Sequence, residues 1–304
     1  MRDRIKRIGK WVGLGLLVLV LGVGLYVGGV AYAYGRSVDH VYDVPLPDIE
    51  RSTDPEVLAR GEHLARSLGG CALSDCHSAD LGGGQTADLG PIGSMTAPNI
   101  TAGGRGAQYS DAELARLIQH GVKRDGRTVR FMPAHETAWL PDEDVRALVT
   151  YVRSVPSVSR PSGPMEIGLL GRILDRHDMI PIDIARRIDH AERSAPPAPA
   201  PTAAYGAYIG RMCTGCHGEH LSGGPIPGAP PDMAVPLNIT PHAEGLGDWT
   251  YEDFETVMRT ARRRDGRALD PMMPTEAVTN MDDTERRALW EYLRSVPPTP
   301  SGQR

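Results

Sequence analysis

The chain contains two copies of one unit, and this repeat limits its possible folds more than any other feature does. Residues 131–156 match residues 272–297 without a gap, and Asn-Ile-Thr occurs at 99–101 and again at 238–240. The paired positions lie 139 to 141 residues apart throughout. A chain of 304 residues has room for about two domains of ordinary size. The repeat therefore predicts two similarly folded domains of roughly 100 residues each.

Both copies carry the sequence pattern of helices. Apolar residues recur with helical spacing in 55–68 and 109–123 of the first copy and in 250–263 of the second. Ser110 and Glu113 form a capping-box pattern at the start of one segment. A further apolar stripe closes each copy: Val145, Leu148, Val149 and Val152, then Leu289, Trp290 and Leu293. No stretch alternates convincingly as a strand would, so we expect an all-α fold.

Long segments rich in Gly and Pro separate these helices. One of them, residues 81–101, is longer than the loops that compact small domains usually contain. Aromatic residues make up only 5% of the chain, so few large side chains are available to fill a core. Both observations favour segments that wrap a large, flat cofactor.

All four cysteines lie in two corresponding places, each followed by a histidine. The second copy contains Cys213-x-x-Cys216-His217, the signature of haem c attachment, in which two thioether bonds hold the porphyrin and the histidine lies beneath the iron. The first copy contains Cys71-x4-Cys76-His77 in the same register. The alternatives are a zinc or redox C-x-x-C and, for Cys71 and Cys76, a disulfide without haem. The adjacent histidine in both copies favours two covalently attached haem c groups.

A Met-Pro pair follows 55 or 56 residues after each of these histidines. Met132 and Met273 are therefore the candidate sixth iron ligands, with His77 and His217 on the opposite side. A thioether is a soft ligand, and Met/His ligation raises the reduction potential of the iron. Met272 is an adjacent alternative, and Met95 and Met233, which precede the Asn-Ile-Thr sequences, are weaker ones.

Several other polar residues have two possible interpretations. Asn99 and Asn238 formally match glycosylation acceptors, but in this context we expect them to pin a loop. Arg127 and Arg267, in the repeated Arg-Asp-Gly-Arg, either balance propionate charge or lie in a solvated turn. The histidines without a counterpart in the other copy are expected to be surface or packing residues: His63, His120, His135, His220 and His242.

The N-terminus has the composition of a membrane anchor. Residues 1–10 carry five basic side chains and a single acid, and residues 11–35 carry no charge. About 20 helical residues cross the hydrocarbon core of a bilayer, and the basic flank stays in the cytoplasm. We expect an anchor at 11–34, a bacterial inner-membrane location and a periplasmic globular part. A cleaved signal peptide, with Ala31-Tyr32-Ala33 as its site, is the alternative and also exports the globular part.

The motifs at 213–224, 236–274 and 289–298 resemble the mono- and dihaem cytochrome c family. Its members include cytochrome subunits of membrane-bound alcohol, aldehyde and gluconate dehydrogenases. The resemblance covers about residues 54–298 and implies a class I cytochrome c fold in each copy. It also implies His77 and His217 as proximal ligands and Met132 and Met273 as distal ones. This chain departs from those subunits, which usually carry three haems, because it can attach only two and its apolar segment is N-terminal.

The expected organisation is a basic flank (1–10), an anchor (11–34), two cytochrome c domains (50–157 and 203–298) and a Pro-rich connector (158–202). We expect an electron carrier between a quinol-oxidising complex or dehydrogenase and a downstream oxidase or soluble carrier, without catalytic activity of its own. The alternatives are a dihaem enzyme of the peroxidase or thiosulfate-oxidising type, with one open haem, and a structural subunit of a respiratory complex. The net charge of -5 gives no sign of nucleic-acid binding.

Overall fold

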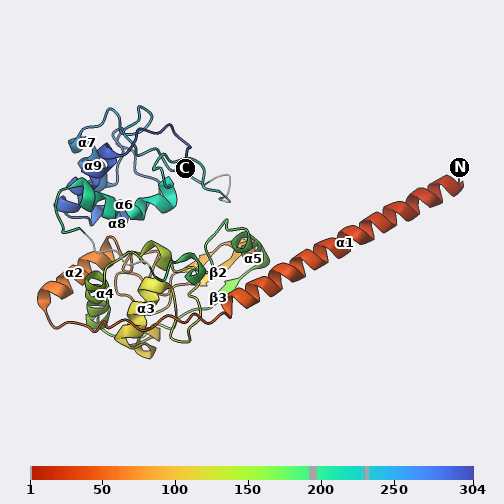
Figure 1. The fold of residues 1–304 in the computed structure, drawn as a ribbon, viewed down its shortest axis with the longest axis horizontal. Helices are drawn as coiled ribbons and strands as arrows, with labels where there is room; N and C mark the ends of the chain where they lie inside the picture. The colour runs from red at the N-terminus through yellow and green to blue at the C-terminus, as the bar shows by residue number, and fades with distance from the viewer. Residues whose placement is uncertain (1, 192–196, 228, 230–232) are drawn as a thin grey trace.

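One long helix projects from the globular part of the molecule (Figure 1). In this computed structural model, which describes residues 2–191, 197–227, 229 and 233–304, the helix is α1 (Arg2–Val38). Residues Lys6–Val38 are long and apolar enough to cross a membrane, with a mean hydropathy of 2.3 in the most apolar window. A signal sequence has the same properties, so length and composition leave both interpretations of this segment open.

The first copy is built around three helices, α2 (Pro55–Arg66), α3 (Asp111–His120) and α4 (Asp142–Ser154). The predicted capping box at the start of α3 is confirmed, because Ser110 Oγ accepts from the Glu113 amide while the Glu113 carboxylate accepts from the Ser110 amide. Short 3₁₀ segments join these helices at Gly90–Ile92 (η1), Arg105–Gln108 (η2) and Ala134–Glu136 (η3).

The second copy contains α6 (Ala203–His217), α7 (Tyr251–Thr260), α8 (Thr275–Thr279) and α9 (Asp283–Ser295). Helix α7 begins with the same type of capping box, made by Thr250 and Asp253. Helices α6, α7 and α9 correspond in order and position to α2, α3 and α4 (Figure 1). The two copies therefore share one helical plan.

In both copies the first helix packs closely against the last. In each copy the two helices touch at a glycine of the first helix. A Cβ on Gly61 would lie 1.9 Å from the carbonyl oxygen of Ala147, and a Cβ on Gly206 would lie 1.9 Å from that of Ala288. No other residue type permits this approach. The apolar core around these crossings is continuous between the copies and includes Leu148 and Leu289.

The fold is mostly helical, as expected, but it also contains a small antiparallel sheet that no sequence pattern predicted. Strands β1 (Thr86–Asp88), β2 (Gly93–Thr96) and β3 (Met165–Ile167) pair in that order. Strands of three or four residues are too short to show an alternating pattern. The first two strands lie in the long Gly- and Pro-rich segment, and the third lies beyond α4.

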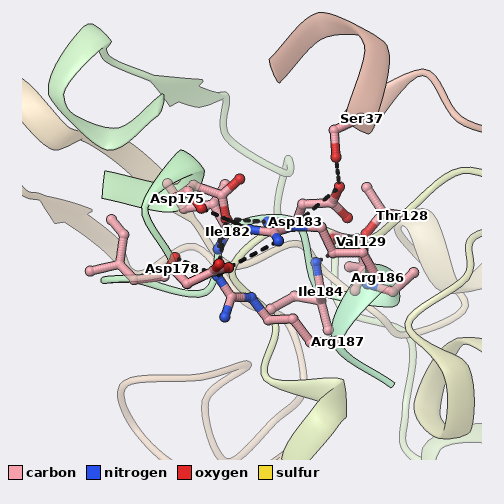
Figure 2. A network of polar contacts seen from close by, with 12 residues as sticks. Ser37, Thr128, Val129, Asp175, Asp178, Ile182, Asp183, Ile184, Arg186 and Arg187 are labelled. Atoms are coloured by element: carbon pink, nitrogen blue, oxygen red, sulfur yellow. Dashed lines mark hydrogen bonds and ion pairs between the residues drawn. The ribbon is translucent and has the colours of Figure 1, made fainter. Parts of the chain in front are cut away.

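The connector is folded against the first copy up to residue 191. After β3 it forms α5 (Leu169–Arg176) and a 3₁₀ turn, η4 (Ala185–Arg187). A buried polar network holds it in place (Figure 2). Asp175 accepts from the amides of Ile182 and Asp183 and pairs with Arg186. The hydroxyl of Ser37 donates to Asp183, so the end of α1 is tied to the same network.

Candidate functional site

The second cysteine pair lies at the C-terminal end of α6. Cys213 and Cys216 are one helical turn apart, so their side chains share a face of the helix. His217 is buried, and its Nδ1 lies 2.7 Å from the carbonyl oxygen of Leu237. This hydrogen bond places the proton on Nδ1 and leaves Nε2 as the free lone pair. A histidine held in this way is oriented to bind iron through Nε2.

The first cysteine pair reaches an equivalent arrangement by a longer path. Helix α2 ends at Arg66, and a turn at 67–70 leads to Cys71. The His77 amide donates to the carbonyl of Cys71, which closes the longer loop, while Ser74 and Asp75 are exposed. The Nδ1 of His77 lies 2.8 Å from the carbonyl oxygen of Pro98. The two additional residues therefore bulge outward, as a haem site with this spacing requires.

All four thiols are free, so the Cys71–Cys76 disulfide considered above is not formed. Burial, with a contribution from the neighbouring thiol, raises the pKa of Cys71 and that of Cys213 to about 12. Burial also lowers the pKa of His77 and that of His217, which keeps both rings in the neutral form that binds metal.

The arrangement does not match a zinc site. Within the described part of the chain, the one group of side chains close enough to share a metal ion is His63, Asp282 and Glu285, and it includes no cysteine. A structural zinc needs four convergent ligands. Two thiols beside a histidine with a free Nε2 instead fit covalent attachment of haem.

The two methionines are presented by identical turns. Pro133 and Pro274 have backbone angles of -79°, 56° and -71°, 71°, which are those of an inverse γ-turn. The carbonyl of Met132 accepts from the Ala134 amide, and the carbonyl of Met273 from the Thr275 amide, each at 2.7 Å. Both side chains pack on the apolar core that Cys71 and Cys213 also contact.

The alternative methionines lie elsewhere. Met272 is 55% exposed, and Met95 lies in β2, paired with Met165 of β3. Met233 lies in an irregular segment next to residues outside the described ranges. The two residues that share a turn and a core contact are Met132 and Met273, so they remain the better candidates for iron ligation.

The repeated asparagines act as loop anchors. The side chain of Asn99 donates to the carbonyls of Val158 and Arg160 and accepts from the amide and hydroxyl of Thr101. Asn238 makes the matching bonds to Thr299 and Thr240. Both asparagines are buried, so neither is open to glycosylation in the folded chain. Each one fixes the loop that supplies the carbonyl to the site histidine.

The arginines of the repeated turn lie in solvent. Arg127 and Arg267 each pair with the aspartate of their own turn, Asp125 and Asp265. Their side chains are 46% and 73% exposed, which fits the solvated-turn interpretation.

Two of the unmatched histidines take part in contacts that the sequence did not reveal. His120 lies 3.0 Å from His190 of the connector. His63 bonds Glu285 of the other copy at 2.9 Å, and Glu285 is fully buried. The sequence did carry a signal for the second contact, because Asp144 and Glu285 are acids at matching positions of the two closing helices.

The contact between the copies is reciprocal. His63 of α2 bonds Glu285 of α9, and Tyr208 of α6 donates to Asp144 of α4 at 3.2 Å. Arg60 lies between the two acids, 2.9 Å from Asp144 and 3.6 Å from Glu285. In each copy a polar side chain of the first helix, His63 or Tyr208, therefore bonds an acid of the other copy's last helix, and Arg60 is an additional partner from the first copy. This pattern indicates an approximate two-fold relation between the copies.

The same reciprocity extends to the cysteine loops. The amide of Ser74, between Cys71 and Cys76, donates to Glu276, which follows Met273 in the other copy. Glu136, which follows Met132, lies against Gly215, where a Cβ would be 2.7 Å from the carboxylate. The methionine loop of each copy thus touches the cysteine loop of the other.

Carboxylates at this contact raise the pKa of a cysteine in each of the two sites. For both Cys76 and Cys216 the largest cause is burial. Glu136 adds to the rise in both, and Asp75 and Glu276 add to it for Cys76. Burial also raises the pKa of Glu136 itself. One carboxylate close to both cysteine pairs indicates that the two sites face the same interdomain contact.

Comparison with known proteins agrees with this arrangement. The family model for cytochrome c matches residues 203–297, and the model for cytochrome c oxidase, cbb3-type, subunit III, matches residues 56–152. The two matched regions are the two copies. Cytochrome c domains imply covalently bound haem c.

Several curated proteins are similar to the chain. The cytochrome c subunit of quinone alcohol dehydrogenase from Gluconacetobacter polyoxogenes is 28% identical over 281 residues, covering 82% of this chain and 58% of that protein. The corresponding subunit from Gluconobacter oxydans (strain 621H) is 26% identical over 294 residues, covering 83% and 57%. The fructose dehydrogenase cytochrome subunit of Gluconobacter japonicus is 31% identical over 115 residues, covering 33% and 24%. The chain thus spans less than three fifths of the length of these relatives.

Proposed function

We propose that this chain is a membrane-anchored dihaem electron carrier. The premise is that it contains cytochrome c domains homologous to the cytochrome c subunits of quinone alcohol dehydrogenase and other dehydrogenases. In this proposal residues 50–157 and 203–298 are two class I cytochrome c domains. Residues 158–202 connect them, and residues 11–34 form the anchor behind the basic flank 1–10.

The observation that carries the proposal is the identical set of groups in the two copies. Cys71 and Cys76 would hold one haem c and Cys213 and Cys216 the other. His77 and His217 would bind iron through the free Nε2, and Met132 and Met273 would bind it from the opposite side. When bound, a haem c group supplies a one-electron couple, and a thioether ligand raises its potential.

The contact between the copies supports exchange of electrons between the two sites. The cysteine loop of each copy touches the methionine loop of the other, through Ser74 and Glu276 and through Gly215 and Glu136. The buried pairs around Arg60 hold the copies in one orientation. A fixed orientation keeps the separation of the two sites constant.

The partner is proposed to be a membrane-bound dehydrogenase, or another quinol-oxidising complex, on the donor side. The relatives support this partner, since two of them are cytochrome c subunits of quinone alcohol dehydrogenase. The acceptor is proposed to be an oxidase or a soluble carrier. A periplasmic location at a bacterial inner membrane is proposed as well, and the basic flank and the apolar length of α1 support it.

Two measurements on the detergent-extracted chain test the proposal. Mass spectrometry should find two added haem groups. The oxidised protein should show the weak red-end absorption band of Met–iron ligation at an intensity that corresponds to two haems. A high-spin iron signal at one haem would contradict the carrier function and favour an enzyme with an open site.

The matched variants are Met132→Leu and Met273→Leu. Each is expected to remove half of the red-end band and to lower the potential of one haem. Met95→Leu is the control, because Met95 pairs in the small sheet and should leave the band unchanged. Co-purification of a dehydrogenase with the unmodified chain tests the partner.

A further inference from the structure

Helix α5 of the connector has an apolar face that the protein does not cover. Its buried side is marked by Gly171, where a Cβ would lie 2.3 Å from the carbonyl oxygen of Ile92, and by Asp175. Leu169, Leu170 and Ile173 project from the other side of the helix, given 3.6 residues per turn. Leu169 is 46% exposed and Leu170 is 39% exposed, while Ile173 is partly buried. Met179, just after the helix, is 41% exposed.

This face lies beside the long helix. Figure 1 shows α5 next to the point at which α1 meets the first domain. The Tyr26 hydroxyl lies 2.9 Å from the Nε2 of His177, which caps α5. One turn further along α1, Val30 is buried. Two turns further, the ring of Tyr34 lies under the guanidinium of Arg172. Helix α1 is therefore bare up to about Tyr26 and covered by the connector from about Val30.

The length of α1 gives the position of the bilayer. A helix rises about 1.5 Å per residue, so about 20 residues from Trp11 span a hydrocarbon core of roughly 30 Å. The core then ends near Val30. Tyr26 is four residues before that point, or about 6 Å inside the boundary. Its contact with His177 brings the end of α5 to the depth at which interfacial helices lie, about 5 to 10 Å into the headgroup and acyl boundary.

We propose that α5 lies in the membrane–water interface, with Leu169, Leu170 and Ile173 in contact with lipid and Arg176 at the level of the phosphates. The occupant of this face is the bilayer that α1 crosses, so the inference rests on the proposed anchor. Continuity of the apolar face with the apolar helix is the main argument for lipid. The polar network of Asp175, Asp183 and Ser37 fixes α5 to the end of α1, and so the interfacial helix sets the orientation of the first domain above the membrane.

Spin labels in lipid nanodiscs test this proposal on the full haem-loaded chain. A label is attached to Leu170→Cys, and its collision rates with oxygen and with a water-soluble nickel chelate are compared. Two reference positions are used: Leu19→Cys within α1 and Glu252→Cys, an exposed position on α7 of the second copy. We expect an oxygen-to-nickel ratio at residue 170 that lies between the two references and is several-fold higher than at residue 252.

The outcomes separate the inference from the anchor on which it rests. A ratio at residue 170 equal to that at residue 252, with residue 19 deep in lipid, overturns the interfacial position of α5 and leaves the anchor intact. Nickel access at residue 19, or release of the chain by alkaline carbonate, overturns the anchor itself. If Leu170→Cys fails to fold, Leu169→Cys gives the same measurement on the same face.

Discussion

The two copies share four structural features but differ in the path of the chain between the helix crossing and the first cysteine. Both have a glycine where the first helix crosses the last, a histidine bonded to a loop carbonyl, a Met-Pro γ-turn and an asparagine that pins a loop. Ten positions separate Gly61 from Cys71, whereas seven separate Gly206 from Cys213. Two more residues lie between the cysteines of the first copy.

The difference shows which parts of the unit must be kept and which are free to vary. In the second copy α6 runs without a break from the crossing to His217. In the first copy α2 stops, and a turn takes up the additional length before Cys71. The contact points stay the same because each is fixed by a close packing or a buried hydrogen bond. The two residues added between the cysteines, Ser74 and Asp75, lie at the surface, where they cost little, and there Ser74 gains a contact with the other copy.

Removing either cysteine pair is expected to have the largest effect on the molecule. Cys213→Ala with Cys216→Ala should leave one haem of two, and Cys71→Ala with Cys76→Ala should do the same. Each loss takes away the cofactor that completes a domain with few large side chains, so the affected copy should lose helical structure. Mass spectrometry of the intact chain and circular dichroism measure both effects.

A deletion sharpens this test. Removing Ser74 and Asp75 turns the first site into C-x-x-C-H, and both haems should be retained because the two deleted side chains are exposed. If the first pair of alanine substitutions leaves two haems, the first copy does not hold one and the parallel between the copies fails.

Adding a methyl group at the helix crossing is expected to be the next largest effect. A Cβ at Gly61 or Gly206 would come within 1.9 Å of a carbonyl oxygen, so the helix pair must move apart. We expect Gly61→Ala and Gly206→Ala each to lower the free energy of unfolding of its own domain by about 3 kcal/mol.

Denaturant unfolding in detergent measures this change. Gly35→Ala is the control, because no atom lies within 4 Å of a Cβ at that position. A large loss for one glycine with none for the other would show that the two helix pairs do not pack alike.

Removing an asparagine anchor should have a smaller effect of the same size in both copies. Asn99→Ala leaves the carbonyls of Val158 and Arg160 without a donor, and Asn238→Ala does the same to Thr299. Each change should cost about 2 to 3 kcal/mol of unfolding free energy, because buried polar groups lose their partners. The red-end band should also weaken, since each loop supports a site histidine. A loss of stability with an unchanged band would limit the asparagine to a purely structural role.

The smallest expected effect is a pH dependence at the contact between the copies. The hydrogen bond to Glu285 raises the pKa of His63, helped by the charges of Glu285 and Asp282 and opposed by burial and by Arg60. A raised folded-state pKa means that the stabilisation is complete below the unfolded value, about 6.5, and is lost as the pH rises through the folded value. We expect stability to fall over this range, at alkaline rather than acid pH.

The reciprocal contact provides the control for this measurement. His63→Gln should abolish the pH dependence. Tyr208→Phe, which removes the matching bond to Asp144, should retain it, because burial and then Asp144 raise the pKa of Tyr208 far above this range. An equal pH dependence in both variants would assign the titration to another group.

Much of the site could be predicted from the sequence because its chemistry depends on neighbours along the chain. A histidine directly after a cysteine and a proline directly after a methionine mark the candidate iron donors without knowledge of the fold. The capping box at Ser110 is local for the same reason. The three short strands escaped prediction because pairing across β1, β2 and β3, and not their own residues, makes them strands.

By itself the sequence determined the duplication, the helices, the two cysteine–histidine sites and the apolar segment, since periodicity and adjacency are properties of the chain alone. Only the tertiary structure decided that His63 meets Glu285, that Asn99 holds Val158 and that α5 lies beside α1. These contacts join residues far apart in the sequence, and each requires that a buried polar or apolar surface be matched by another. Such a match depends on how the whole chain folds, and even a matched pair of acids such as Asp144 and Glu285 does not identify the partner of either one.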